Sequence, residues 1–252
     1  MAPATVDSAT DARRAALAGL FDHAALFPPA SLEVEAALAE DRRVRRAPEG
    51  WLVARFVCPL SRLDALGAVE VPLSVVVDEE PDTRLDDPRI EALEIPPGRD
   101  AAALAARGVP VFVERPPAEL GWLEALPPGA AAKVRCGGHA VPSVEELAAF
   151  VRRCRELGLR FKATAGLHHP VRGEREHGFL NLLAAAIFGD EERALAERDR
   201  DAFRLDADAF AWRDRAAGGD VVARVRRDLL VGIGSCSVAE PVADLRALGI
   251  LG

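Results

Sequence analysis

The distribution of apolar residues is the feature that most limits how this chain can fold. Eight short runs rich in Val, Ile, Leu and Phe alternate with longer amphipathic stretches, which is typical of repeated βα units around a parallel sheet. These runs cover residues 24–27, 52–57, 73–77, 92–95, 109–114, 131–135, 160–165 and 229–234. Eight strands in units this short favour an α/β fold of the (β/α)8 TIM-type barrel class over an open doubly wound sheet.

Apolar residues at helical spacing predict helices between these strands, over residues 32–46, 61–67, 100–107, 118–125, 143–157 and 242–248. Ser143 and Glu146 form a capping-box pattern, and Gly158 stands where that helix would end. Residues 11–20 predict an extra N-terminal helix before the first strand. Proline borders the short first and fourth runs, so a distorted or incomplete barrel stays open as an alternative.

The length of 252 residues suits one large domain that covers residues 1–252. Segment 167–228 is longer than a barrel crossover needs. It predicts a long helical insertion between the seventh and eighth strands, with helices over 178–188 and 191–200 and a polar turn near 206–214.

Composition bears on partners and location. The net charge is -8, and 32 lysine and arginine residues are interleaved with 40 acidic ones, which argues against a nucleic-acid surface. Neither a long apolar run nor a charged-then-apolar start occurs, so we expect no membrane span, no secretory signal and a cytoplasmic location. No dinucleotide or P-loop pattern appears, and no cofactor is expected. A homo-oligomer stays open.

Only two lysines occur in the chain, Lys133 and Lys162, and each lies near the end of a predicted strand. Arginine stays charged at neutral pH, whereas a desolvated lysine can act as a nucleophile and form a Schiff base. The two-residue period of a strand puts Arg135 on the same side as Lys133, and Thr164 on the same side as Lys162. Two inward lysines on neighbouring strands would lower each other's pKa. Alternatively, each lysine pairs with a barrel carboxylate such as Glu114, or points outward.

Glu114 ends an otherwise apolar fifth strand and is the best candidate for a general acid or base. If it is buried and faces inward, its pKa should be raised toward the range useful for proton transfer. Asp78 and Glu94 end the third and fourth strands, where a capping or loop-bracing role is favoured. Asp22 or His23 is a further candidate near the first strand, although a turn explains that segment equally well.

A polar loop follows the seventh strand and contains three of the five histidines, His168, His169 and His177. Neutral imidazoles are common metal ligands, so a metal site is one interpretation. We favour a clamp for a polar substrate, with Arg172 gripping a carboxylate or phosphate. If a helix starts at His177, Asn181 faces the same direction. Loop structure without a binding role is the remaining alternative.

Three short runs at the C-terminal strands resemble one enzyme family. Lys162-Ala-Thr-Ala-Gly166 resembles the K-A-S-G-G run on the seventh strand of class I aldolases of the deoxyribose-phosphate aldolase type. Lys133-Val-Arg-Cys-Gly137 stands where that family has K-T-S-T-G with its Schiff-base lysine. Ile233-Gly-Ser-Cys-Ser237 is similar to the I-G-T-S-S run that helps bind phosphate. The resemblance implies that Lys133 forms the imine, that Lys162 lowers its pKa, and that Gly234 with Ser235 cradles a phosphate or oxyanion.

These patterns lead to one main hypothesis and two alternatives. The main hypothesis is a lyase of aldolase type that acts on a small anionic oxo-substrate, either a sugar phosphate or an oxo acid. In it Lys133 or Lys162 forms an imine, Glu114 or a histidine moves protons, and Arg135 and Arg172 hold the anion. One alternative is a metal-dependent hydrolase or lyase that uses the histidines. The other is a non-catalytic barrel that binds an anionic small molecule.

Overall fold

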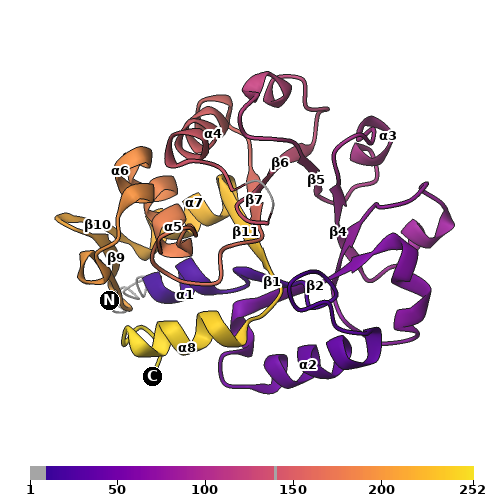
Figure 1. The fold of residues 1–252 in the computed structure, drawn as a ribbon, viewed down its shortest axis with the longest axis horizontal. Helices are drawn as coiled ribbons and strands as arrows, with labels where there is room; N and C mark the ends of the chain where they lie inside the picture. Colours follow the sequence, from indigo (N-terminus) through magenta and orange to yellow (C-terminus); the bar gives the residue numbers. More distant parts are fainter. Residues whose placement is uncertain (1–9, 139–140) are drawn as a thin grey trace, which may run out of the picture.

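A closed barrel of eight parallel strands forms the centre of the computed structural model, which describes residues 10–138 and 141–252 (Figure 1). The order around the barrel is β1-β11-β7-β6-β5-β4-β3-β2. These strands are β1 (Phe21–His23), β2 (Val53–Pro59), β3 (Leu73–Val76), β4 (Ile90–Ile95), β5 (Val111–Glu114), β6 (Ala130–Arg135), β7 (Phe161–Thr164) and β11 (Leu230–Ser235). The predicted TIM-type barrel is confirmed.

Each barrel strand packs an apolar side against the outer layer and turns its other side inward. In β6, Ala132 and Val134 belong to the large cluster shared with the surrounding helices, whereas Ala131 belongs to a small separate cluster with Ala92 and Phe112. That small cluster is made of inward residues of β4, β5 and β6 and forms an apolar floor inside the barrel. Polar side chains come next along the same inward faces.

The strand register brings the predicted site residues onto neighbouring positions. Glu114 of β5 lies beside Lys133 of β6, and Lys133 lies beside Lys162 of β7. The two lysines therefore stand at matching positions of adjacent strands, as predicted. Their ammonium groups pair with barrel carboxylates, Glu114 among them, which is the alternative that the sequence left open.

Helices and short 3-10 turns connect the strands. The helices are α1 (Ala12–Leu17), α2 (Val34–Arg46), α3 (Ala102–Ala105), α4 (Val144–Leu157), α5 (Phe179–Phe188), α6 (Glu191–Ala196), α7 (Gly219–Asp228) and α8 (Ala239–Ala247). The 3-10 turns are η1 (Gly50–Leu52), η2 (Leu60–Leu66), η3 (Thr83–Asp86), η4 (Leu120–Leu123) and η5 (Arg200–Ala202).

Helix α4 follows the sequence signals closely. Ser143 and Glu146 form the predicted capping box, and Gly158 ends the helix in the left-handed conformation, with φ of 64°. The helices predicted over 61–67 and 118–125 are instead the 3-10 turns η2 and η4. In the second case prolines stand on both sides of the segment and limit a longer helix.

The prediction of the first strand over residues 24–27 is wrong, because the strand begins three residues earlier in the chain. The strand is Phe21–His23, and the Phe27 amide donates to the Ala24 carbonyl (2.9 Å) in a turn that follows it. The buried acid Asp22 interrupts the apolar pattern of the strand itself. The turn that follows is made of Ala, Leu and Phe, so its sequence has the apolar character expected of a strand.

The insertion after β7 is only partly helical. Helices α5 and α6 lie where helices were predicted, but the expected polar turn near 206–214 is an antiparallel sheet of β8 (Phe203–Leu205), β9 (Ala209–Trp212) and β10 (Arg215–Gly218), at the edge of the molecule in Figure 1. Phe210 of this sheet stacks on Phe188 of α5, with ring centroids 6.0 Å apart. These strands have only three or four residues each, and Asp and Arg residues separate them. The alternation of apolar and polar residues that indicates a strand is therefore too short to recognise in the sequence.

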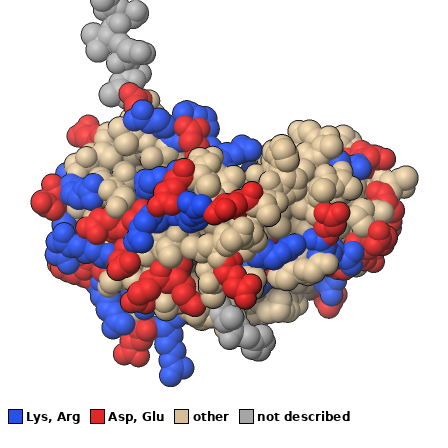
Figure 2. All heavy atoms as spheres, turned by 90° about the horizontal axis from the view of Figure 1, so that it is seen from above, with Lys and Arg blue, Asp and Glu red and all other residues tan. Residues whose placement is uncertain are grey.

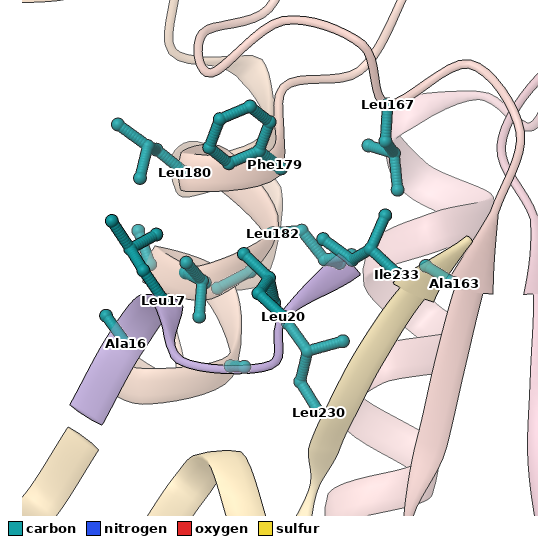
Figure 3. Close-up of a cluster of buried hydrophobic side chains, with 14 of the residues drawn as sticks. Ala16, Leu17, Leu20, Ala163, Leu167, Phe179, Leu180, Leu182, Leu230 and Ile233 are labelled. Carbon is teal, nitrogen blue, oxygen red and sulfur yellow. The ribbon is translucent and has the colours of Figure 1, made fainter. Parts of the chain in front are cut away.

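Helix α5 is buried over residues 179–186, and Asn181 is the one polar residue among them. Figure 3 shows Phe179, Leu180 and Leu182 of this helix in a cluster with Leu17, Leu20 and Ile233. Phe179 meets Phe21 of β1 edge to face, with ring centroids 5.4 Å apart. Leu182 of α5 lies beside Ile233 of β11 in the same cluster. The inserted segment thus anchors the outer faces of the two strands that close the barrel.

Acidic and basic side chains are interspersed on the face seen in Figure 2, without an extended region of one sign. Within residues 10–138 and 141–252, no helix has both the length and the apolar character needed to cross a membrane. All four cysteines are buried and free.

The aromatic contact between α4 and β7 should be important for stability. Phe150 packs edge to face on Phe161, with ring centroids 5.4 Å apart, and is fully buried. Phe150→Ala should lower the free energy of unfolding by about 3–5 kcal/mol in urea denaturation, because the cavity left behind cannot close fully. Val221→Ala, on an exposed position of α7, is the matched control and should change it by less than about 1 kcal/mol. Equal effects of the two changes would contradict this packing.

Candidate active site

A cavity of about 840 Å³ opens at the carboxyl ends of the barrel strands. Its wall includes Glu94, Glu114, Lys133 and Thr164, each at or near the end of a strand. This end of a TIM-type barrel is where catalytic residues are found, and the volume lies within the roughly 300–1,000 Å³ of small-molecule sites.

Two lysines and three carboxylates form a continuous ion-pair network inside the barrel. The Lys133 Nζ lies 2.6 Å from Glu94 Oε2 and 2.8 Å from Glu114 Oε2. The Lys162 Nζ donates to Asp22 Oδ2 (2.5 Å) and to the other oxygen of Glu94. Glu94 therefore bridges the two ammonium groups.

At the mouth, the network ends on an arginine. The Arg135 Nε donates to Glu114 Oε1 at 3.0 Å, and half of the Arg135 side chain is exposed. Charges alternate along the whole series, which runs Asp22, Lys162, Glu94, Lys133, Glu114 and Arg135.

One glycine of β11 is required by a close approach at the cavity. A Cβ at Gly234 would lie 2.7 Å from the Thr164 hydroxyl and 3.7 Å from Cε of Lys162. A side chain at this position would therefore collide with Thr164 of β7, whereas its distance to Lys162 is an ordinary contact.

The ion pairs reverse the pKa shifts predicted from sequence. Burial alone would raise the pKa of Glu114, but Lys133 and Arg135 outweigh it and hold the pKa below its usual range. Burial likewise acts to lower the pKa of Lys133, but Glu94 and Glu114 hold it above its usual value. The predictions of a raised pKa for Glu114 and a lowered pKa for Lys133 are wrong, because each group directly contacts opposite charges.

Glu94 is the central residue that sequence reasoning undervalued. Its carboxylate is 2% exposed, accepts a hydrogen bond from the Ser74 hydroxyl (2.6 Å), and has its pKa held far below the usual range because both lysines overcome the effect of burial. The sequence favoured a capping or loop-bracing role for Glu94. Its position between Leu93 and Ile95, whose side chains point to the other face of the strand, is the sequence signal that indicates an inward carboxylate.

The other candidate acids divide between bracing and site roles. Asp78 accepts from the Ser61 amide (3.0 Å) and hydroxyl (2.6 Å), so it braces a loop as favoured. Asp22 faces into the barrel and accepts from the Arg55 amide (3.0 Å). His23 faces outward and contacts Asp41 of α2 (3.0 Å).

Several predicted site residues do meet at the cavity. The wall contains Lys133, Glu114, Arg135, Thr164, His168 and Gly234. Lys162 lies just below them, is 1% exposed and is not among the lining residues. Arg175 and Glu176, which were not predicted to bind substrate, line the mouth.

Five predicted binding residues do not line the cavity: His169, Arg172, His177, Asn181 and Ser235. The His169 ring is half exposed and its Nδ1 lies 2.6 Å from Asp244 of α8. The Ser235 hydroxyl donates to the Ser237 carbonyl (2.5 Å) within its own turn. Closeness to a strand end in the sequence does not predict whether a side chain points into the cavity or away from it.

Arg172, His177 and Asn181 instead hold the loop after β7 in place. His177 Nε2 donates to the Pro142 carbonyl (2.8 Å), so its Nδ1 accepts from Arg172 (3.0 Å). Burial and the Arg172 charge hold the pKa of His177 below its usual value despite the Pro142 contact. Asn181 Oδ1 accepts from the Arg172 amide (2.8 Å), and its Nδ2 donates to the carbonyls of α6. Helix α5 starts only at Phe179, so the predicted shared helix face is wrong.

The histidines also do not converge on one point. His168 Nδ1 lies 3.4 Å from Glu240, whereas His169 and His177 have the separate partners given above. In the described residues, no three His, Cys, Asp or Glu side chains are arranged to hold a metal ion. His139 lies outside those residues.

In comparisons with known proteins, no protein family, no curated protein and no solved structure matches this chain. Only the chemistry of the cavity residues therefore bears on function.

The network should make stability depend on pH in the acid range. Glu94 and Glu114 have folded pKa values below their ordinary value of 4.5, so they stabilise the fold above that pH and lose this effect as pH falls further. Glu94→Gln should lower the free energy of unfolding at about pH 6 by about 3–5 kcal/mol, because it leaves buried ammonium groups incompletely paired. It should also flatten the fall in stability between about pH 5 and pH 3.

Urea denaturation across this pH range measures both effects. Glu80→Gln, which removes a carboxylate that is 94% exposed and outside the network, is the control. The ion-pair network would be contradicted if Glu94→Gln were as stable as Glu80→Gln and kept the full acid slope.

Proposed function

We propose that the protein is a lyase of aldolase type that forms an imine between Lys133 and a small oxo-substrate with an anionic group. The observation that carries the proposal is a buried amine in the cavity wall, 2.8 Å from a carboxylate that can accept its proton. Lys133 is preferred over Lys162 as the nucleophile because only Lys133 lines the cavity.

Proton transfer from Lys133 to Glu114 would prepare the amine for attack. The ion pair becomes a neutral amine and a carboxylic acid, and the net charge of the network does not change. Because the ion pairs hold the pKa of Lys133 above and that of Glu114 below their usual values, the resting site favours the charged forms, and the exchange depends on the bound substrate. The pairing that raises the pKa of Lys133 at rest thus also supplies the proton acceptor.

The amine then adds to the carbonyl carbon, and one of its protons moves to the carbonyl oxygen to give a carbinolamine. Glu114 returns the proton it accepted to the new hydroxyl group, which leaves as water and yields a protonated imine. Glu114 then takes the proton of a hydroxyl group on the β-carbon of the substrate, the neighbouring carbon–carbon bond breaks, and a carbonyl product leaves while the imine becomes an enamine. Glu114 returns that proton to the enamine carbon, and hydrolysis of the resulting imine by water releases the second product and Lys133, so the water formed earlier is consumed again.

Lys162 acts in this scheme as a positioning residue. It is fully buried between Asp22 and Glu94, below the cavity wall. Its charge keeps Glu94 ionised, and Glu94 in turn holds the Lys133 ammonium in place.

Two arginines at the mouth suit the anionic group of the substrate. Arg135 and Arg175 both line the cavity, and a guanidinium can bind a carboxylate or phosphate through two hydrogen bonds. Arg172, the residue first predicted for this role, is occupied by His177. Arg175 therefore takes its place in the proposal.

Reductive trapping tests the imine directly, because Lys133, Lys162 and the N-terminus are the only primary amines in the chain. Borohydride added with pyruvate or glyceraldehyde 3-phosphate should label the peptide that contains Lys133, detected by mass spectrometry. Lys133→Arg should abolish that label, whereas Lys162→Arg should still be labelled at Lys133. A label confined to Lys162 or the N-terminus would reject Lys133 as the nucleophile.

The role of Glu114 is tested by the rate of trapping. Glu114→Gln keeps the shape of the side chain but cannot accept the proton, so the rate of imine formation should fall roughly 10²- to 10⁴-fold. Glu176→Gln, at the cavity mouth, is the control and should change the rate little. An unchanged rate in Glu114→Gln would assign the proton transfer to another group.

One observation favours a non-catalytic alternative. Both lysines are fully paired with carboxylates at rest, so the network could serve only to bind a charged ligand. Calorimetric binding of oxo acids without any trapped adduct would support this alternative.

A further inference from the structure

The cavity has two walls of opposite character. Its polar wall is built by β4 to β7 and the loops after them, and includes Glu94, Glu114, Lys133, Arg135, Thr164 and His168. The reacting groups of the proposed mechanism all lie on this wall.

The other wall is apolar. The loop after β1 and strands β2 and β3 contribute Ala24, Phe27, Pro28, Pro29, Val57 and Val76. Among the described residues, none that these strands contribute to the lining has a polar side chain. In the closed order of the barrel, β2 is opposite β6, so Val57 faces the cavity from the side opposite Lys133.

The backbone of the apolar wall is also poor in hydrogen-bond donors. Pro28 and Pro29 line the cavity and have no backbone N–H. A ligand hydroxyl group against this wall would give up its hydrogen bonds to water with little in return. The proline rings are stiff, so the surface exists before a ligand binds.

We propose that the substrate is an oxo acid with an apolar arm, not a sugar phosphate. The carbonyl group faces Lys133, the carboxylate lies near Arg135 and Arg175, and the arm lies on the wall of Phe27, Val57 and Val76. The placement of the carbonyl rests on the proposed function, whereas the affinity of the wall for an apolar arm does not.

Saturated carboxylates separate this affinity from imine chemistry, because they have no carbonyl group. Butanoate, hexanoate and octanoate should bind the wild-type protein with rising affinity in calorimetry, by roughly two- to fourfold per added methylene. Glycerol 3-phosphate should bind more weakly than hexanoate. In trapping experiments, 2-oxooctanoate should label Lys133 at lower concentration than pyruvate or glyceraldehyde 3-phosphate.

Two variants locate the arm. Phe27→Ala and Val57→Thr should each weaken octanoate binding roughly three- to tenfold and leave butanoate binding almost unchanged. Val221→Thr, on the exposed face of α7 outside the cavity, should alter neither. Thermal unfolding of each variant shows that it is folded.

The outcomes distinguish the two proposals. Affinity that does not depend on chain length, or tighter binding of glycerol 3-phosphate than of octanoate, would overturn the apolar-arm proposal. Efficient labelling of Lys133 by glyceraldehyde 3-phosphate but not by 2-oxooctanoate would also overturn it and leave the imine intact. Chain-length dependence that is lost in Phe27→Ala and Val57→Thr, without any adduct, would uphold the apolar arm and reject the imine.

Discussion

The carboxylate of Glu94 is the contact on which the barrel interior depends. It is almost fully buried and binds one ammonium group on each oxygen, from Lys133 and Lys162. A single buried charge is very costly, and it is tolerated only where opposite charges and hydrogen bonds surround it. Asp22, Glu114 and Arg135 extend the pairing, and the Arg55 guanidinium lies 3.7 Å from the carboxylate of Asp22. The apolar floor below it, with Phe112, keeps this layer away from the other end of the barrel.

Such a network ties the two halves of the barrel together. Asp22 comes from β1, Glu94 from β4, and the lysines from β6 and β7, so strands far apart in sequence share one set of ion pairs. Buried ion pairs contribute little net stability compared with apolar packing, but removal of one member is strongly destabilising. Stability alone therefore does not account for this cluster, and buried charges of this kind are more typical of a site where they take part in chemistry.

The barrel could be predicted from sequence because seven of its strands overlap the runs rich in apolar residues, which recur along the chain with amphipathic segments between them. The lysine pair could be predicted because both residues stand at the same distance from a strand end. The role of Glu94 was undervalued despite its position between Leu93 and Ile95, since an acid at a strand end can either cap a loop or face inward. Strand β1 was misplaced because Asp22, which pairs with Lys162 inside the barrel, also breaks the apolar pattern of the strand. Arg172, His177 and Asn181 were misassigned because only the folded insertion determines that they turn away from the cavity.

The apolar wall and the paired lysine would act together in the proposed mechanism. At rest, Glu94 and Glu114 stabilise the charge of Lys133, and Lys133 and Arg135 stabilise the charge of Glu114. Both side chains line the cavity, so an apolar arm on Val57 and Val76 would make their surroundings drier, which favours the neutral amine and carboxylic acid over the ion pair. The amine would then become nucleophilic mainly when a ligand of the right shape is bound. In this way a lysine whose pKa is raised at rest is compatible with imine chemistry, because its activation accompanies substrate binding and needs no permanently lowered pKa.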